Sequence, residues 1–261
     1  MKTKNLITVI AHQDDEICLF NRIYNFKNKN NVYIFYLTSG LNKTLNKNNI
    51  NYRNQESIKV LKKLGVLEKN IIFLGDKPQI KTQELYHNLF PIYKRLAYNL
   101  KKIRGKKIIY THALEGGHLD HDCCYYISRQ LIKNFKDIDK IYQFPSYHSK
   151  NLPFIFYRVL NPIKENGRLY KKKYNFFKRF KFIYLLFFYK SQLLESMVWI
   201  GMYPFLIFHF LFSKSDVIQK IDLNLNNIRR PHKSRLLYEK RGHEDYFNFE
   251  KKIQIFLKNF N

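Results

Sequence analysis

Residues 6–16 read LITVIAHQDDE, a mostly apolar run that ends in a cluster of polar and acidic residues. A short apolar run of this kind, bounded by polar sequence, is typical of a buried strand. The pattern recurs at residues 32–37, 70–74 and 107–111, each followed by polar or glycine-rich sequence. Helical patterns separate these runs, so the sequence predicts strands that alternate with helices.

The helices expected between the strands cover residues 17–26, 53–64 and 82–100. In the second of them, Ile58, Leu61 and Leu64 repeat at helical spacing, and Gly65 follows as a natural C-terminal cap. We therefore predict, for residues 1–150, an α/β fold with a Rossmann-like parallel sheet and helices on both faces. In such sheets, the loops at the carboxyl ends of the strands build the functional site.

The second half, residues 151–261, is rich in Phe, Tyr and Lys, and we expect it to be a basic, aromatic extension that completes the fold. Residues 182–212 are almost continuously apolar and aromatic. The uncharged stretch 196–212 is close to the lower limit for a membrane-spanning helix, although Pro204 and His209 interrupt it. Packing in the core or against a partner, a helix lying in the membrane plane and a true span all remain open.

The formal net charge is +27. Lys and Asn recur throughout, as in proteins from AT-rich genomes, and the basic residues are scattered, with local clusters at 171–173, 178–181 and 229–230. A generally solvated basic surface explains this charge, and so does a patch for phosphate groups or an anionic membrane. A nucleic-acid-binding role is less favoured, because no recognised binding motif accompanies the charge.

The three cysteines, Cys18, Cys123 and Cys124, lack the paired spacing of a disulfide framework or a Cys-rich zinc cluster. A reducing compartment fits this usage. The apolar run before His12 is too short for the core of a secretion signal. We therefore expect the protein to be cytoplasmic.

Two polar segments follow two of the predicted strands. The first is His12 to Glu16, and the second is residues 112–122, which read HALEGGHLDHD. Neighbouring parallel strands can bring both to one edge of the sheet. Two imidazoles and one carboxylate are a ligand set for catalytic zinc, whose fourth position holds a water. The predicted ligands are His12, Asp15 and His121, and Asp14 is then free to act as a base.

Each segment alone has a structural explanation. The first can be a helix N-cap whose carboxylates interact with the helix dipole, and the second can be a surface loop. Their combination at two strand ends, with Gly116 and Gly117 allowing close backbone approach, favours a metal site. We interpret His112, Glu115 and Asp122 as supporting or surface residues rather than ligands.

With these motifs the sequence resembles the LmbE-like, or PIG-L-like, zinc deacetylases. Residues 11–16, AHQDDE, resemble the A-H-P-D-D-E signature of that family, and residues 118–121, HLDH, resemble its H-P-D-H signature. The T-x-G turn matches residues 38–40, the R-x-x-E helix matches Arg53 and Glu56, and residues 189–192 resemble a Y-x-S-Q stretch of some members. The resemblance covers roughly residues 4–150. Gln13 and Leu119 replace both signature prolines, which should alter the turns more than the chemistry.

The resemblance implies removal of an acetyl group from an N-acetylglucosamine-type sugar with Zn²⁺ or another divalent metal. In this reaction Asp14 is the general base and then passes its proton to the departing amine. A protonated His118 and the metal stabilise the oxyanion. Asp120 orients a neighbouring histidine.

Three further residues are candidates for substrate binding. Arg53 can hold sugar hydroxyls or a phosphate, or it can pair with Glu56 as an exposed helix cation. Tyr147 and His148 can line the pocket or close the next strand. The basic, aromatic second half suggests a sugar carried on a phosphate-containing lipid or nucleotide in surface glycan assembly, with peripheral contact to an anionic membrane. The alternatives are an amidase acting on a non-sugar amide and a membrane-associated binding protein with a degenerate site.

Overall fold

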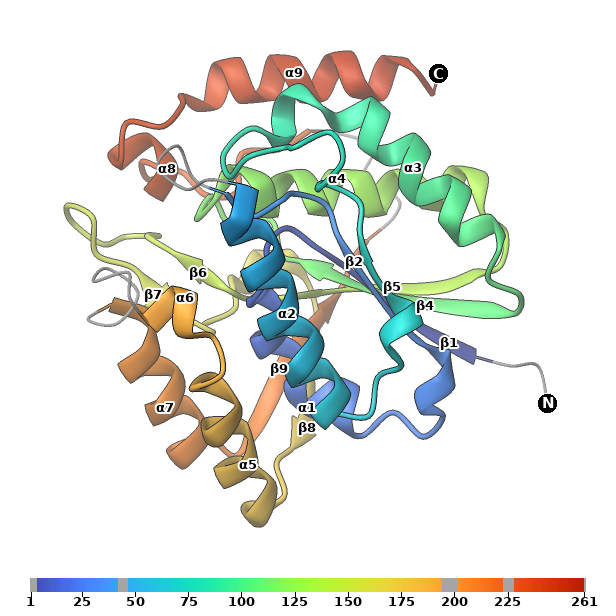
Figure 1. Ribbon diagram of the computed structural model, residues 1–261. Helices are drawn as coiled ribbons and strands as arrows, with labels where there is room; N and C mark the ends of the chain where they lie inside the picture. Colours follow the sequence, from blue (N-terminus) through green and yellow to red (C-terminus); the bar gives the residue numbers. More distant parts are fainter. Residues whose placement is uncertain (1–3, 42–46, 194–200, 223–227, 261) are drawn as a thin grey trace.

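The computed structural model describes residues 4–41, 47–193, 201–222 and 228–260, and within them seven strands form one sheet (Figure 1). Their order across the sheet is β3, β2, β1, β4, β5, β9, β8. In chain order the strands are β1 (Lys4–Ile10), β2 (Val32–Tyr36), β3 (Ile71–Phe73), β4 (Lys106–His112), β5 (Ile138–Phe144), β8 (Leu169–Lys173) and β9 (Ser215–Lys220). Strands β6 (Tyr147–His148) and β7 (Arg158–Val159) form a separate two-stranded ladder.

The central strand β1 pairs in parallel with both β2 and β4. Val9 near the end of β1 lies in register with Thr111 near the end of β4. The segments that follow these strands therefore leave the sheet at the same edge. This confirms the predicted parallel α/β sheet and its convergence of the two polar segments.

Side chains of β1 alternate between two cores. Leu6 and Ile10 join the core on one face, whereas Ile7 and Val9 join the core on the other, as the period of a strand requires. Helices α3 (Leu89–Lys101), α4 (Leu119–Asn134) and α9 (Tyr246–Lys258) contribute to the second core, and α1 (Phe20–Tyr24), α2 (Lys47–Lys63), α5 (Phe176–Leu186) and α7 (Tyr203–Phe212) to the first (Figure 1). The prediction of helices on both faces is confirmed.

Helix α2 ends as the sequence predicts. Gly65 has a φ of 90°, its N–H donates to the carbonyl of Lys62, and the N–H of Val66 donates to the carbonyl of Leu61. These two bonds form a Schellman motif, which requires the left-handed conformation that glycine adopts readily.

Two predicted helices are shorter than expected. The span 17–26 contains a 3₁₀ turn, Asp15–Leu19, before the short α1. The span 82–100 becomes α-helical only at Leu89. Before that residue, Gln83 has a φ of 71°, outside the α-helical region, and Leu85–His87 form a 3₁₀ turn. The opposite error occurs at α4, whose first turn lies in the segment that the sequence suggested to be a polar loop.

The second half of the chain adds β9 and β8 to the sheet as antiparallel strands. It also supplies α5, α7, α9 and the short helices α6 (Lys190–Leu193) and α8 (Leu237–Lys240). Of the apolar span 182–212, residues 194–200 lie outside the described part. Among the helices that are described, none combines the length and the apolar character needed to cross a membrane.

Candidate metal centre

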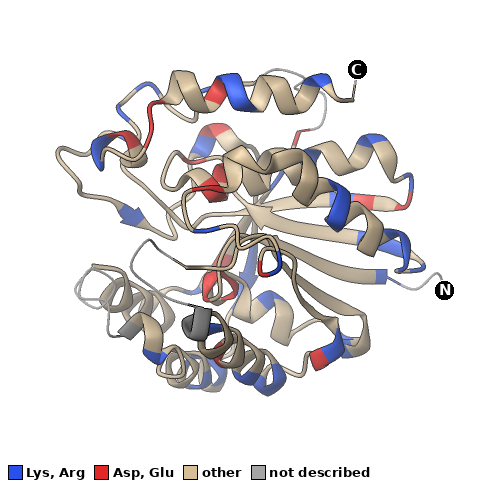
Figure 2. Ribbon diagram, turned by 45° about the horizontal axis from the view of Figure 1, so that its top comes forward, with Lys and Arg blue, Asp and Glu red and all other residues tan. Residues whose placement is uncertain are grey.

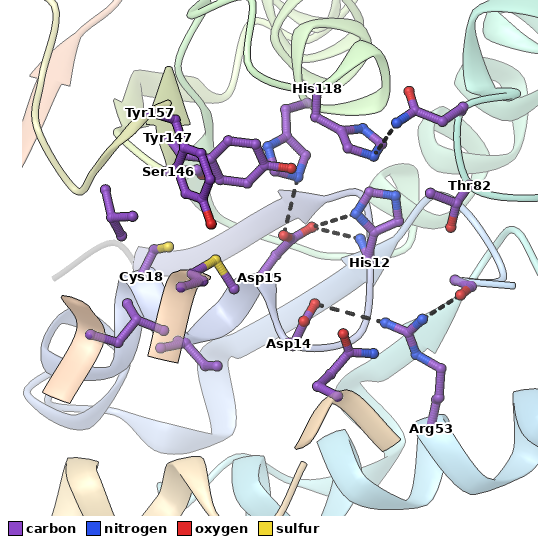
Figure 3. A pocket seen from close by; sticks show the side chains of 18 of the residues that line it. His12, Asp14, Asp15, Cys18, Arg53, Thr82, His118, Ser146, Tyr147 and Tyr157 are labelled. Carbon is purple, nitrogen blue, oxygen red and sulfur yellow. Dashed lines mark hydrogen bonds and ion pairs between the residues drawn. The ribbon is translucent and has the colours of Figure 1, made fainter. Parts of the chain in front are cut away.

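The turn after β1 folds back on itself through the carboxylate of Asp15. Its Oδ2 accepts hydrogen bonds from the backbone N–H groups of Ala11 at 3.1 Å and His12 at 2.6 Å. The same oxygen lies 3.0 Å from Nε2 of His112. The other oxygen, Oδ1, lies 3.2 Å from Nε2 of His121. Asp15 therefore uses one oxygen to shape the turn and keeps the other for a ligand (Figure 3).

The loop after β4 delivers the second pair of histidines at the start of α4. His118 is the N-cap residue, and its Nδ1 accepts a hydrogen bond from the backbone N–H of Asp120 at 3.1 Å. The ring of His121 lies 5.4 Å from the ring of His12 and 4.9 Å from that of His118, measured between centroids. The two polar segments thus meet in space as the sequence predicts.

Two groups of three described side chains could each hold a metal ion. The ligand atoms of His12, His118 and His121 lie within 4.8 Å of one another, and so do those of Asp15, His112 and His121. The ligand set predicted from the sequence matches neither group completely. It takes His12 from the first group, Asp15 from the second and His121 from both.

Hydrogen bonds distinguish the histidines of the two groups. Both ring nitrogens of His112 have protein partners, because Nδ1 lies 2.9 Å from Oγ of Ser146 and Nε2 lies 3.0 Å from Asp15. In His118, Nδ1 accepts a backbone hydrogen bond, so the neutral ring carries its proton on Nε2 and has no further lone pair for a metal. His12 and His121 each turn a ring nitrogen toward Asp15, at 3.5 and 3.2 Å, which keeps them candidates for the imidazole ligands.

A buried carboxylate holds His12. Oδ2 of Asp120 lies 2.9 Å from Nε2 of His12, whose Nδ1 then faces Asp15 at 3.5 Å. Asp120 also accepts hydrogen bonds from the backbone N–H groups of Gln83 at 2.7 Å and Leu85 at 3.0 Å. Burial alone lowers the pKa of His12, but its hydrogen bonds to Asp120 and Asp15 outweigh this and raise the pKa to about 10. The two carboxylates around His12 thus stabilise positive charge at this point.

His118 differs from the sequence-based expectation. Burial, together with the nearby rings of His12 and His121, lowers its pKa well below the ordinary value. Because Nδ1 also accepts a backbone hydrogen bond, His118 is neutral and carries its N–H at Nε2. Nε2 lies 2.9 Å from the amide group of Gln83, whose oxygen has no other partner among the described residues, so that oxygen, with the amide turned over, is the acceptor of this N–H. The expected imidazolium is thus replaced by a neutral N–H donor.

Asp14 lies at the tip of the turn, with a φ of 118°. Figure 3 shows its side chain pointing toward Arg53, and Oδ1 lies 3.9 Å from Nη2 of that residue. Burial raises the pKa of Asp14 well above its ordinary value, although Arg53 opposes this. No described residue donates a hydrogen bond to its carboxylate, which leaves the group available beside the histidine cluster.

Arg53 is buried, only 6% exposed, so the exposed helix cation considered from the sequence is wrong. Its Nη1 donates to the carbonyl of Gly40, and its Nη2 donates to the carbonyl of Gln13 at 2.9 Å. With its amide oxygen turned toward Arg53, Gln192 accepts from both nitrogens at 3.3 and 2.9 Å. The protein itself thus engages most of the guanidinium donors.

Glu56, the sequence-based partner of Arg53, instead accepts hydrogen bonds from the backbone N–H and the hydroxyl of Ser191, at 2.9 and 2.5 Å. Ser191 and Gln192 belong to the Y-x-S-Q stretch. This stretch therefore connects α6 to both residues of the R-x-x-E pair.

Gln13, at the first replaced proline, is buried. Its Nε2 donates to Oδ1 of Asn54 at 2.6 Å and to the carbonyl of Ser39 at 3.3 Å, and Asn54 in turn donates to Asp76 at 2.6 Å. Its Oε1 has no hydrogen-bond partner among the described residues. The turn is therefore held by side-chain hydrogen bonds in place of a proline ring.

The histidine cluster opens into a cavity of about 270 Å³. The side chains that line it come from both halves of the chain (Figure 3): His12, Asp14, Asp15, Ile17, Cys18, Arg53, Thr82, Gln83, His118, His121, Ser146, Tyr147, Tyr157, Val159, Gln192, Met202, Leu206 and Arg241, with Gly40 contributing backbone. A cavity of this size suits a small polar ring such as a monosaccharide, and its wall combines apolar side chains with ionisable ones.

Of the two predicted pocket residues in the next strand, only Tyr147 lines the cavity. Its ring lies 5.4 Å from that of His121. His148 is buried elsewhere, with Nε2 bonded to the carbonyl of Asn161 at 2.9 Å and Nδ1 to the N–H of Lys150 at 3.2 Å. Strand alternation explains the difference, because adjacent residues point to opposite sides.

Gly117 permits the close approach of this strand. A Cβ atom at this position would lie 1.9 Å from the carbonyl oxygen of Tyr147. The glycine therefore allows the loop before α4 to pack directly against the strand that supplies a pocket wall.

The sequence reasoning missed several pocket residues, among them Gln83, Tyr157 and Arg241. Gln83 and Arg241 lie in segments that carry no signature, and only the fold brings them to the cavity. Arg241 lies over the ring of Tyr157 at 5.4 Å, and its Nε is buried without a hydrogen-bond partner among the described residues.

Comparison with known families gives a match over about half of the chain. Residues 7–132 match the model of the PIG-L family, described as GlcNAc-PI de-N-acetylase. No curated protein shows a significant match to the sequence.

Several solved structures are similar. A deacetylase involved in the teicoplanin biosynthetic pathway matches with a TM-score of 0.58 and 13% identity, covering 84% of this chain and 98% of its own. A zinc-inhibited form of teicoplanin deacetylase matches with a TM-score of 0.57, 13% identity and the same coverage. The N,N'-diacetylchitobiose deacetylase of Pyrococcus horikoshii matches with a TM-score of 0.56 and 15% identity, covering 87% of this chain and 86% of its own. At these identities the likeness establishes a shared fold.

Proposed function

We propose that this chain, which matches the PIG-L family model over residues 7–132 and shares the fold of two deacetylases, is a metal-dependent hydrolase that removes the acetyl group from an N-acetylglucosamine-type sugar. One observation carries this proposal. Two imidazoles, the carboxylate of Asp15 and the separate carboxylate of Asp14 converge in one sugar-sized cavity. This is the set of groups that metal-assisted amide hydrolysis needs.

His12, Asp15 and His121 would hold the metal in this proposal. The donor set of two nitrogens and one oxygen fits zinc. A divalent ion there would polarise the acetamide carbonyl and lower the pKa of a bound water from about 15.7 to near 7.

The proton-transfer steps belong to Asp14. Its carboxylate, held next to Arg53, takes the proton from the attacking water and later donates it to the departing amine. Arg53 keeps this carboxylate in place through its contacts with Gln13, Gly40 and Gln192. We therefore assign Arg53 mainly a positioning role rather than the substrate-binding role expected from the sequence.

The neutral His118 supplies an N–H at Nε2 to the carbonyl oxygen as negative charge develops on it. A single donor of this kind contributes about 3 to 4 kcal/mol in other hydrolases. Asp120 positions His12 through the bond to Nε2 and acts only through that ring.

The sugar is proposed to be carried on a phosphate-containing lipid or nucleotide, in the assembly of a surface glycan. We place the reaction in the cytoplasm, at the periphery of an anionic membrane. The free thiols of the described residues Cys18, Cys123 and Cys124 are compatible with a reducing compartment.

Arg241 is the cation best suited to an anionic group on this substrate. It lines the cavity, and unlike Arg53 it forms no ion pair with any Asp or Glu in the described ranges. Replacing Arg241 with Met should raise the KM for N-acetylglucosamine 1-phosphate by roughly 10- to 150-fold, the equivalent of one charged hydrogen bond worth about 1.5 to 3 kcal/mol. The KM for unphosphorylated N-acetylglucosamine should change little. Steady-state kinetics on both compounds measure the difference.

Arg235→Met is the matched control, since Arg235 is a nearby exposed arginine that donates to the carbonyl of Glu239 at 3.1 Å. It should leave both KM values unchanged. If Arg241→Met raises the KM for both compounds by the same factor, Arg241 has no role specific to the anionic group.

The proposed function is tested by incubating the purified protein with N-acetylglucosamine, its 1-phosphate and lipid-linked N-acetylglucosamine carriers. Mass spectrometry should show the loss of one acetyl group, and the apoprotein should regain activity with Zn²⁺ or another divalent metal. Release of a larger acyl group from a non-sugar amide instead would favour the amidase. Absence of bound metal and of any turnover would point to a binding protein.

A further inference from the structure

Helices α5 and α7 expose an unusual number of aromatic side chains. In α5 and its C-terminal end, Phe177, Phe180, Tyr184 and Phe187 are spaced by three, four and three residues, so they form one stripe. Their exposed fractions are 80%, 54%, 55% and 45%. The helix buries a different stripe, represented by Phe182, in the core. It is therefore apolar on two sides.

Helix α7 repeats this arrangement. Phe205, Phe208 and Phe212 are spaced by three and four residues and are 54%, 62% and 65% exposed. Leu206 and Phe210 face the core. We call the outward stripes of α5 and α7 together the aromatic face.

The two helices lie side by side (Figure 1). The rings of Phe182 and Phe210 are 5.7 Å apart on their inner sides, and Arg179 donates from α5 to the carbonyl of Leu211 in α7 at 2.7 Å. The two stripes thus lie on neighbouring helices, and clustered exposed apolar side chains of this kind are typical of an interaction surface.

The charge around the aromatic face is positive. Lys29, Lys178 and Lys181 lie 5.4, 4.6 and 4.7 Å from the centre of the Tyr24 ring, beside α5. Burial and the neighbouring Lys172, Lys178 and Lys181 lower the pKa of Lys29 to about 8, which shows how closely the positive charges are placed.

Neither α5 nor α7 contains an Asp or Glu. Figure 2 shows Lys and Arg along the helices at the lower edge of the molecule. A surface that combines aromatic rings with positive charge is complementary to an anionic bilayer. A second copy of the chain would bring the same charge of +27 and repel it.

Helix α7 also forms part of the catalytic pocket. Leu206, and Met202 just before the helix, line the cavity, whereas Phe205 and Phe208 on the same helix point outward. The pocket wall and the aromatic face are thus two sides of one helix.

We infer that the aromatic face docks on the surface of an anionic lipid bilayer, with α5 and α7 lying in the interfacial region. The docked enzyme would hold its pocket one helix away from the lipids. The position of the pocket near the lipids matters only if the substrate is a lipid-linked sugar, so this consequence rests on the proposed function. Docking itself does not depend on catalysis.

The test is sedimentation of the full chain with vesicles of phosphatidylcholine alone or mixed with phosphatidylglycerol. The wild type should bind the anionic vesicles, and less so at high salt. The variant Phe177→Ser/Phe180→Ser/Phe208→Ser/Phe212→Ser should bind them at least 10-fold more weakly. Its matched control is Phe247→Ser/Ile255→Ser on α9, where the two side chains are 72% and 54% exposed. The control should bind like the wild type.

The charge contribution is tested separately with Lys178→Ala/Lys181→Ala, compared with Lys251→Ala/Lys252→Ala on α9. Only the α5 pair should weaken binding to anionic vesicles. Docking is overturned if the wild type ignores these vesicles, if the Phe variant binds as well as the control, or if that variant instead converts a dimer to a monomer.

Deacetylation of a water-soluble N-acetyl sugar separates this inference from the proposed function. A Phe variant that remains active on that sugar but no longer binds vesicles supports docking. A wild type that binds vesicles and has no deacetylase activity contradicts the proposed function alone.

Discussion

Asp15→Ala is expected to abolish both metal binding and turnover. Oδ1 of Asp15 lies 3.2 Å from His121, and Oδ2 holds the turn that carries His12. The substitution removes a proposed ligand and also loosens the position of another. Even residues that only orient a ligand typically change metal affinity by roughly 10- to 100-fold, so we expect a loss of more than about 100-fold. Elemental analysis after dialysis measures the metal, and acetate release measures turnover.

The control for this substitution is Asp139→Ala, which removes an exposed carboxylate on β5. It should retain full metal content and activity. His12→Ala should reproduce the double loss seen in Asp15→Ala. Circular dichroism confirms that each variant is folded, and stoichiometric metal in folded Asp15→Ala would contradict the proposed ligand set.

Asp14→Asn is expected to keep the metal and lose most of the turnover. The amide has the shape of the carboxylate but cannot accept the proton of the attacking water. General acid–base catalysis contributes about 10²- to 10⁴-fold to rate, and we expect kcat to fall by that factor. The metal content should match the wild type, because Asp14 contacts Arg53 and is not a member of either cluster that could hold an ion.

Comparing these variants separates the two acids of the turn. If Asp14→Asn loses metal as completely as Asp15→Ala, Asp14 contributes to metal binding and is not only the general base. If it retains both metal and turnover, another group accepts the proton.

The sequence predicted the parts of the site that depend on strand order. A parallel pair of apolar strands places the residues after Ile10 and after His112 at one edge, and the structure confirms this. The direction of Tyr147 and His148 could not be read from the sequence, because one residue of strand register decides which of them faces the cavity.

Other features depend on contacts between distant segments. One of the two sequence-based alternatives for Arg53 is an exposed helix cation paired with Glu56, but Gln192 and the loop at Gly40 cover it. The charge state of His118 depends on the N-cap geometry of α4, which the sequence suggested to be a loop. Arg241 reaches the pocket from a segment far along the chain. No local pattern indicates any of these contacts.

The carboxylate of Asp120 restrains how this pocket can evolve. It forms a hydrogen bond with His12 and also accepts hydrogen bonds from the backbone N–H groups of Gln83 and Leu85. Thr82 and Gln83 of the same segment line the sugar-sized cavity. Mutations at positions 82–85 that change the substrate must therefore keep the backbone N–H groups of residues 83 and 85. Without them Asp120, and with it the ring of His12, would lose its fixed position. Proline is thus barred from positions 83 and 85, and selection for a new substrate there acts through side chains on a fixed backbone.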